Sequence, residues 1–171
     1  MEGKTKILQI VGYQNSGKTT LIQKILQMGS RIGFQMGTIK HHGHGGAPDT
    51  AVSKKDTQRH QEAGAMLTAV EGNGDLMLSW GKDNWTIDKI LDVYAQFNLD
   101  IILIEGYKNA ALPKVVLIRE HEDEVLLSAL NNIKAVISWY PLISKGAYPI
   151  FFIKEEEKIL NWFYEDMLES L

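Results

Sequence analysis

The chain has 171 residues, a formal net charge of −3 and a 44% share of hydrophobic residues, which suits one globular domain with its own core. It contains no cysteine, and this excludes disulfides, thiolate zinc sites and cysteine nucleophiles. The small net charge argues against a nucleic-acid-binding surface, and no apolar stretch approaches the length of a membrane span. At the start of the chain, residues 1–6 run directly into an apolar segment and leave no room for a signal peptide, so we expect a cytoplasmic protein.

The first predicted strand, residues 7–11, is followed by a sequence that fits the pattern G-x-x-x-x-G-K-[ST]. Apolar side chains then recur after residue 20 at the spacing of one helix face. A strand, a glycine-rich turn and a helix in this order are the setting of a phosphate-binding P-loop. The residues predicted to bind nucleotide phosphate are Gly12, Tyr13, Gln14, Asn15, Ser16, Gly17, Lys18, Thr19 and Thr20.

Two side chains of this loop are the predicted catalytic residues. Lys18 is expected to contact the terminal phosphates of a nucleoside triphosphate, and Thr19 to bind Mg²⁺ through its hydroxyl. The two glycines allow the backbone to approach the phosphates closely, with N–H groups directed at the anion. The sequence therefore predicts a nucleotide-binding protein that requires Mg²⁺.

The next segment is basic and contains a predicted flexible loop. We expect the first helix to end near Gly29 and a second strand to span residues 33–40. Residues 41–53 have no periodicity and read as a loop. Lys40, His41 and His42 are predicted to contribute to an anion site beside the P-loop. Together with His44, the two histidines could alternatively bind Zn²⁺ or Ni²⁺.

An inserted β-hairpin is predicted at about residues 65–80, after a short helix that Asp56 caps and Gly64 ends. Asn73-Gly74 separates two apolar runs there, which is a strong hairpin signal. Apolar residues on an exposed sheet edge are usually covered, so the hairpin either forms a homodimer interface or folds back on its own sheet.

The remaining predicted elements alternate between strands and helices. A helix begins after Thr86, and an apolar strand runs from residue 100 to Glu105. Further strands are predicted at 114–118, 135–138 and 149–153, followed by a last helix that contains residues 159–168. The pattern predicts a single α/β domain over residues 1–171, a P-loop NTPase-like three-layer sandwich with a mostly parallel sheet.

A carboxylate at a strand end commonly completes the Mg²⁺ site of P-loop proteins. Glu105 follows four apolar residues and suits that role, while Asp49 and Asp56 are rivals from the loop region. The base is not identified by any local motif. Residues 53–56 nearly match the guanine-binding pattern [NT]-K-x-D, but they precede the hairpin and do not follow a late strand.

Several segments in one order resemble molybdopterin-guanine dinucleotide biosynthesis protein B (MobB). They lie between about residues 7 and 119 and comprise the P-loop, Thr38-Ile39-Lys40-His41, Glu62-Ala63-Gly64-Ala65, Glu105-Gly106-Tyr107-Lys108 and Pro113-Lys114. The resemblance implies a GTP-binding homodimer with weak GTPase activity. Such a protein assists the molybdenum cofactor guanylyltransferase, which joins GMP to molybdopterin, and residues 40–44 would line a site for a pterin phosphate.

The residues themselves are compatible with two other functions. One is a metal-delivery GTPase of the nickel-chaperone type, with the histidine loop as its cargo site. The other is a small-molecule kinase in which Lys40 or Arg59 holds the acceptor. Slow hydrolysis fits the sequence best, because no arginine finger or water-orienting glutamine is evident, parts that are worth ~10³–10⁵ in rate.

Overall fold

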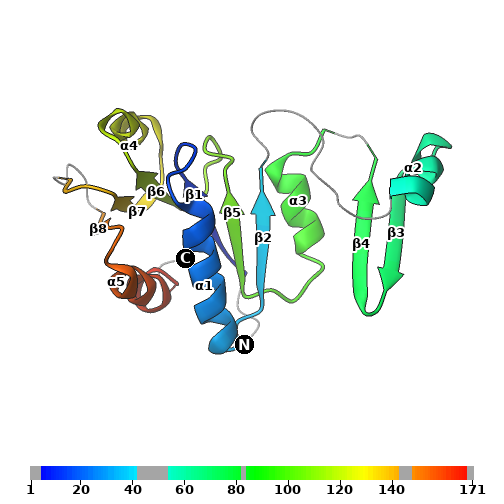
Figure 1. Ribbon diagram of the computed structural model, residues 1–171, viewed down its shortest axis with the longest axis horizontal. Coiled ribbons are helices and arrows are strands. Elements are labelled where there is room, and N and C mark those ends of the chain that lie inside the picture. Colours follow the sequence, from blue (N-terminus) through cyan, green and yellow to red (C-terminus); the bar gives the residue numbers. More distant parts are fainter. Residues whose placement is uncertain (1–4, 42–53, 82–83, 143–147, 169–171) are drawn as a thin grey trace. The chain divides into compact units, whose positions relative to one another are not determined.

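The structure is a computed structural model that describes residues 5–41, 54–81, 84–142 and 148–168. The chain divides into two compact units, residues 1–43 with 91–171 and residues 44–90. The larger unit holds a six-stranded sheet and the smaller one a two-stranded hairpin (Figure 1). The predicted α/β fold with an inserted hairpin is therefore confirmed, whereas the assignment of residues 1–171 to one domain stays a prediction.

All strand pairs of the larger sheet are parallel, in the order β2-β5-β1-β6-β7-β8. The strands are β1 (Lys6–Val11), β2 (Met36–Lys40), β5 (Ile101–Glu105), β6 (Lys114–Ile118), β7 (Ile133–Ser138) and β8 (Ile150–Phe152). Strand β1 lies between β5 and β6: β2 and β5 extend the sheet on one side of it, and β6, β7 and β8 extend the sheet on the other side. The direction in which strands are added to the sheet therefore reverses at β1. Ligands of open parallel sheets bind beyond the carboxyl ends of the strands at such a reversal. In this chain that place is the turn after β1.

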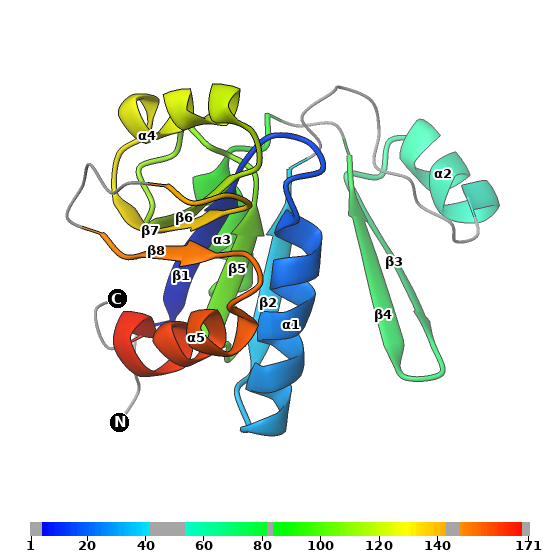
Figure 2. The same ribbon diagram turned by 60° about the vertical axis from the view of Figure 1, so that its left-hand side comes forward.

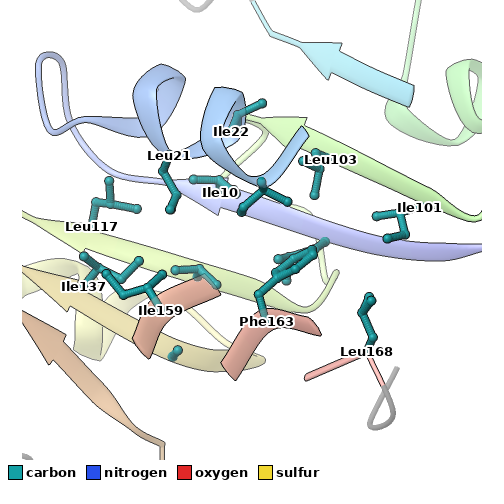
Figure 3. Close-up of a cluster of buried hydrophobic side chains, with 14 residues drawn as sticks. Ile10, Leu21, Ile22, Ile101, Leu103, Leu117, Ile137, Ile159, Phe163 and Leu168 are labelled. Carbon is teal, nitrogen blue, oxygen red and sulfur yellow. The ribbon is translucent and has the colours of Figure 1, made fainter. Parts of the chain in front are cut away.

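Helices of the larger unit cover both faces of this sheet (Figure 2). On one face Ile10, Leu21 and Phe163 share a core between the sheet, α1 and the C-terminal helices (Figure 3). On the other face Val11 packs in a second core with Leu126. The helices are α1 (Lys18–Arg31), α4 (Val125–Ala129) after a 3₁₀ turn (His121–Glu124), and α5 (Glu156–Asn161), continued by a π-helical segment (Trp162–Met167). Strands that are apolar on both faces require this double cover.

Helix α1 ends later than the sequence predicts. It continues through Gly29 to Arg31, and Gly33, with φ of 93°, follows its end. Gly29 is instead buried inside the helix, where an added Cβ would lie 2.2 Å from the Met36 sulfur and 2.5 Å from the Tyr164 hydroxyl. This glycine therefore serves close packing between α1, β2 and the C-terminal segment, and Gly33 takes the positive φ that ends a helix.

The connection from β5 to β6 contains no helix, and buried polar side chains hold it. Gln9 on β1 donates through Nε2 to the carbonyls of Gly106 and Tyr107, at 2.8 and 2.6 Å. Lys114, which is fully buried, donates through Nζ to the carbonyls of Ala110, Leu112 and Asn131, each at 2.9 Å. Burial lowers the pKa of Lys114. A loop over a sheet face exposes backbone carbonyls to a dry interior, and these two side chains satisfy them.

The smaller unit contains α2 (Lys54–Glu62) and the hairpin of β3 (Leu67–Gly72) and β4 (Asp75–Trp80). Asn73 and Gly74 form the turn with φ of 53° and 86°, as the Asn-Gly pair predicts. Helix α2 begins two residues before Asp56, which lies in its first turn and does not cap it. Gly64 follows the helix with φ of 111°, as predicted.

Helix α3 (Ile87–Tyr94) begins as predicted, because the Thr86 hydroxyl accepts a hydrogen bond from the Lys89 N–H at 3.3 Å. Its Tyr94 hydroxyl donates to the Thr38 carbonyl at 2.6 Å and so contacts β2. Gly37 leaves room for this ring, since a Cβ there would approach Tyr94 to 3.1 Å. Within the described parts of the chain, every helix is too short or too polar to span a bilayer.

Candidate functional site

The predicted P-loop forms the turn between β1 and α1. Gly12 is packed so closely that an added Cβ would lie 2.6 Å from the Ser16 hydroxyl and 2.8 Å from the Leu117 carbonyl. Gly17 precedes α1 with φ of 100°, a conformation that favours glycine. The helix has no side-chain cap and no acidic residue in its first turn. Its positive end is therefore free of a competing carboxylate from that turn, which favours an anionic ligand.

Lys18 follows the turn and folds back along it. Its Nζ donates to the Tyr13 carbonyl at 2.7 Å. Partial burial lowers the pKa of Lys18, and the nearby Glu105 carboxylate opposes that shift. The ammonium group is thus held beside the concave side of the loop, where a phosphate can replace the carbonyl as its partner.

Glu105 brings three elements of the site together at the carboxyl edge of the sheet. Its Oε2 accepts a hydrogen bond from the Thr19 hydroxyl at 3.1 Å, and its Oε1 lies 3.6 Å from the Lys40 Nζ. The side chain of Glu105 is 14% exposed and that of Lys40 is 66% exposed. The strand order explains the meeting, because β5 lies between β1 and β2 and its last residue pairs with Ile10 and Lys40.

The turn after Glu105 is closely packed against the end of β2. The His41 N–H donates to the Glu105 carbonyl at 2.9 Å, and its ring lies 4.3 Å from the Tyr107 ring, centroid to centroid. Gly106 has φ of 96°, and a Cβ there would approach the His41 Cβ to 3.0 Å. Tyr107 also has positive φ, at 50°. These contacts hold His41 against the backbone of Glu105 and Gly106 and explain why a glycine follows Glu105.

Positive side chains surround the P-loop turn. Lys18 lies along it, Lys40 lies beside Glu105, and the Lys108 Nζ is 5.0 Å from the centroid of the Tyr13 ring. This arrangement places more positive than negative charge around the turn, which favours a polyanionic ligand. The positive charge predicted for the segment around Lys40 is present, and Lys108 of the β5–β6 connection adds to it.

Two further residues support the turn from outside, and sequence reasoning missed both. The Arg119 Nη1 donates to the Asn15 carbonyl at 3.1 Å, and the Trp139 Nε1 donates to the Ser16 carbonyl at 2.9 Å. The Arg119 guanidinium also lies 5.6 Å from the centre of the Trp139 ring. These two bonds engage the carbonyls of Asn15 and Ser16 and so help to fix the shape of the loop. Arg119 directly follows β6 and Trp139 directly follows β7, both buried strands. A polar or aromatic residue at the carboxyl end of a buried strand is a sequence signal that could have indicated a role at the site.

Around the residues of the P-loop turn itself, the structure brings together the predicted site residues Lys18, Thr19, Lys40, His41 and Glu105. His42 and Asp49 lie outside the described residues, so their predicted roles stay predictions. Asp56, a rival ligand, lies on α2 in the smaller unit and is 3.7 Å from the Arg59 guanidinium. Within the described ranges, no group of three or more His, Cys, Asp or Glu side chains is placed to hold a metal ion.

The hydroxyl of Thr19 and the carboxylate of Glu105 nevertheless fit Mg²⁺. This ion prefers oxygen ligands and is commonly held by one or two protein groups together with substrate phosphates and water. The two oxygens lie 3.1 Å apart at the mouth of the P-loop, so both face the place where the phosphates would bind. The donor set therefore suits a nucleotide-bound magnesium ion better than a cargo transition metal.

Comparison with known proteins finds one family. A model of the family described as molybdopterin guanine dinucleotide synthesis protein B matches residues 7–139. A probable molybdopterin-guanine dinucleotide biosynthesis adapter protein of Bacillus subtilis is 48% identical over 130 residues, which cover 76% of this chain and 75% of that protein. The corresponding adapter protein of Escherichia coli is 33% identical over 157 residues, covering 83% of this chain and 84% of that protein.

Solved structures agree with this similarity. The crystal structure of a MobB protein homolog from Bacillus stearothermophilus is 37% identical, with a TM-score of 0.77 and full coverage of both chains. The structure of Bacillus subtilis MobB is 41% identical, with a TM-score of 0.79, and the match covers 92% of this chain and 95% of that one. The fold is thus shared with these proteins.

Proposed function

The chain belongs to the molybdopterin guanine dinucleotide synthesis protein B (MobB) family, and we propose that it is a GTP-binding accessory protein of molybdenum cofactor biosynthesis. Relatives bear the name of molybdopterin-guanine dinucleotide biosynthesis adapter proteins. In this role the chain binds GTP with Mg²⁺ and acts beside the guanylyltransferase that joins GMP to molybdopterin. Its own hydrolysis of GTP is slow.

The meeting of Thr19, Glu105 and Lys18 at one end of the sheet is the observation that carries this proposal. Thr19 comes from the start of α1 and Glu105 from the end of β5, far apart in sequence. Their oxygens are positioned to share one cation, and the Lys18 ammonium lies on the same loop. A turn that served only to connect β1 to α1 would not need a carboxylate, a hydroxyl and an ammonium around it.

The residues of the site bind and orient, and few of them accelerate hydrolysis. Lys18 neutralises the terminal phosphates, and the N–H groups of the turn hold their oxygens. Magnesium, when bound through Thr19 and Glu105, supplies further neutralisation of phosphate charge. Arg119, an arginine close to the turn, is engaged with the Asn15 carbonyl and the Trp139 ring. It supports the loop's shape, and this arrangement favours stable binding over rapid turnover.

A second anion is proposed to bind next to the nucleotide. Lys40 lies beside Glu105, Lys108 lies over the Tyr13 ring, and the His41 ring is tilted against the Tyr107 ring. An aromatic and imidazole surface beside lysines suits a flat ring system that carries a phosphate. Molybdopterin or its guanine dinucleotide has this chemistry, so we assign it to the side of the site formed by β2 and the turn after β5.

The magnesium assignment is tested by the variant Glu105→Gln. We expect the Mg²⁺ concentration needed for half-maximal GTP binding to rise about 10-fold, because an amide oxygen lacks the carboxylate's charge. Titration of Mg²⁺ at fixed GTP measures it, and Glu62→Gln on α2 is the matched control. An unchanged Mg²⁺ requirement would remove Glu105 from the metal site and return the role to Asp49.

The hairpin supports the proposal of a homodimer. Directly opposite residues of β3 and β4 share a face, and on one face the Gln61 side chain of α2 donates to Ser79. The other face, which we call the apolar hairpin face, consists mainly of exposed apolar residues. Those with large side chains are Leu67, Leu76, Leu78 and Trp80. An apolar surface of this kind on a two-stranded sheet favours association, and we propose that a second copy of the hairpin covers it.

The variant Leu78→Asp tests this interface. An aspartate buried without a partner costs several kcal/mol, so we expect dimer dissociation to become about 100-fold more favourable. Sedimentation velocity across a concentration series measures the shift from dimer to monomer. Ile32→Asp is the matched control, because Ile32 is 55% exposed and Leu78 is 51% exposed, but Ile32 lies in the larger unit. A wild-type chain that stays monomeric at high concentration would contradict the dimer.

A further inference from the structure

A cavity adjoins the P-loop on the side away from Glu105. Its volume is about 170 Å³, and its walls include Gly17 and Thr20 of the loop region together with Trp139. Leu21, Ile153, Ile159 and Leu160 add apolar side chains to it. Pockets for whole drug-sized ligands measure roughly 300–1,000 Å³, so this space suits one planar ring system and not a complete nucleotide. A ring bound here would be continuous with phosphates held at Gly17 and Thr20.

Trp139 forms a rigid wall of this cavity. Its indole Nε1 donates to the Ser16 carbonyl, and the Arg119 guanidinium lies 5.6 Å from its ring. The edge of the indole lies 3.7 Å from the position that a Cβ of Gly17 would occupy. Because both contacts fix the ring's orientation, it presents a stable flat surface at the P-loop. Aromatic side chains of this kind hold nucleobases by stacking, whatever the base.

Glu156 is the acidic residue among the side chains that line the cavity. It begins α5, and its Oε2 forms an ion pair with the Lys24 Nζ of α1. An ionised carboxylate accepts hydrogen bonds and cannot donate one. With one oxygen engaged by Lys24, Oε1 is the other acceptor that the group can present to a ring in the cavity.

We propose that the cavity binds the base of the nucleotide and that Glu156 selects guanine over adenine. Guanine presents two neighbouring donors on its pairing edge, the N1–H and the N2 amino group, whereas adenine has an acceptor at N1. A carboxylate therefore matches guanine and opposes adenine. A site that hydrogen-bonds a substrate group discriminates strongly against an analogue that lacks it, because its own polar atom is left unpaired. This inference rests on the proposed binding of a triphosphate at the P-loop.

A purely structural role for Glu156, as a link between α5 and α1 through Lys24, predicts different behaviour. Loss of that link would weaken binding of every nucleotide alike, since it would loosen the cavity without changing which base fits. A role in reading the base instead changes the order of preference. The substitution Glu156→Gln separates the two, because an amide both accepts and donates. It matches xanthine, which has a donor at N1 and a carbonyl at C2.

The experiment measures the affinities of GTP, ATP and XTP for the full chain with Mg²⁺. We expect the wild type to prefer GTP over ATP by at least about 10-fold. In Glu156→Gln, GTP affinity falls about 10-fold and XTP becomes the preferred triphosphate. Glu157→Gln, the exposed neighbouring acid, is expected to leave the order unchanged. Lys24 also lines the cavity, and Lys24→Met removes the ion pair but keeps the carboxylate, so it too is expected to leave GTP the preferred triphosphate.

Two outcomes overturn the inference in distinguishable ways. If Glu156→Gln and Lys24→Met weaken binding of all three triphosphates equally while Lys18→Ala still weakens GTP binding about 100-fold, the cavity does not read the base and only this inference fails. If the wild type binds none of the three triphosphates, the proposed function fails and the inference fails with it. A reversal of preference towards XTP that is confined to Glu156→Gln supports the assignment.

Discussion

Replacing Lys18 with alanine is expected to weaken GTP binding about 100-fold, equivalent to about 2.7 kcal/mol. The lysine supplies an ammonium group at the P-loop, where it contacts the Tyr13 carbonyl at 2.7 Å. A hydrogen bond between a charged donor and phosphate is roughly twice as strong as a neutral one, and the alanine leaves the phosphate charge without that partner. Isothermal titration calorimetry with GTP and Mg²⁺ measures the loss.

The matched control for this variant is Lys134→Ala. Lys134 lies near the start of β7, at the opposite end of the sheet from the P-loop. Its replacement by alanine removes one positive charge, as Lys18→Ala does. We expect GTP affinity to remain within about twofold of the wild type, because the interaction between solvent-accessible charges more than about 10 Å apart is largely screened by salt. Equal losses in both variants would assign the effect to overall charge. Unchanged affinity in Lys18→Ala would remove the P-loop from the proposed function.

Replacing Lys114 with methionine is expected to lower the free energy of unfolding by about 3 kcal/mol. Methionine keeps a similar length and apolar character but leaves the carbonyls of Ala110, Leu112 and Asn131 without the Nζ donor that lies 2.9 Å from each. A buried acceptor left unsatisfied costs about 1–3 kcal/mol. Methionine also removes the free-energy cost of burying an ammonium group, which opposes this loss of stability. We expect the cost of three unpaired carbonyls to be the larger of the two. Urea denaturation followed by circular dichroism measures the change.

For the Lys114 variant, Lys134→Met provides the comparison, since Lys134 is only partly buried on the neighbouring strand. Its replacement is expected to change stability by less than about 0.5 kcal/mol. If Lys114→Met were as stable as the wild type, the three carbonyls would have to form hydrogen bonds with water molecules instead. The connection from β5 to β6 would then not depend on the buried ammonium group. The denaturant slope should stay constant in both variants.

Much of the fold was predictable because its signals are local. The apolar run that ends at Glu105 became a strand with the predicted final residue, and Lys114–Ile118 became β6. Asn73-Gly74 formed the hairpin turn, because this pair adopts positive φ at little cost. Thr86 capped a helix through its own hydroxyl. Each of these features depends on a few neighbouring residues, so a short window of sequence contains the cause.

The misses come from contacts between distant segments. Gly29 resembled a helix end, yet its small size is required by Met36 and Tyr164, which approach it from β2 and the C-terminal segment. Arg119 and Trp139 support the P-loop from the ends of two later strands. None of these partners can be identified from spacing along the chain, because strand order sets them and a single sequence does not reveal that order.

The sequence alone determined that a turn with the P-loop pattern follows the first strand, since its glycines, Lys18 and Thr19 lie within eight consecutive residues, 12–19. Only the tertiary structure decided that Glu105 stands 3.1 Å from the Thr19 hydroxyl, and that Trp139 and Glu156 line one cavity beside Gly17. The reason is the placement of β1 between β5 and β6, which brings the carboxyl ends of separate strands to one edge. Residues close in sequence form the loop, whereas the order of the strands assembles the site around it.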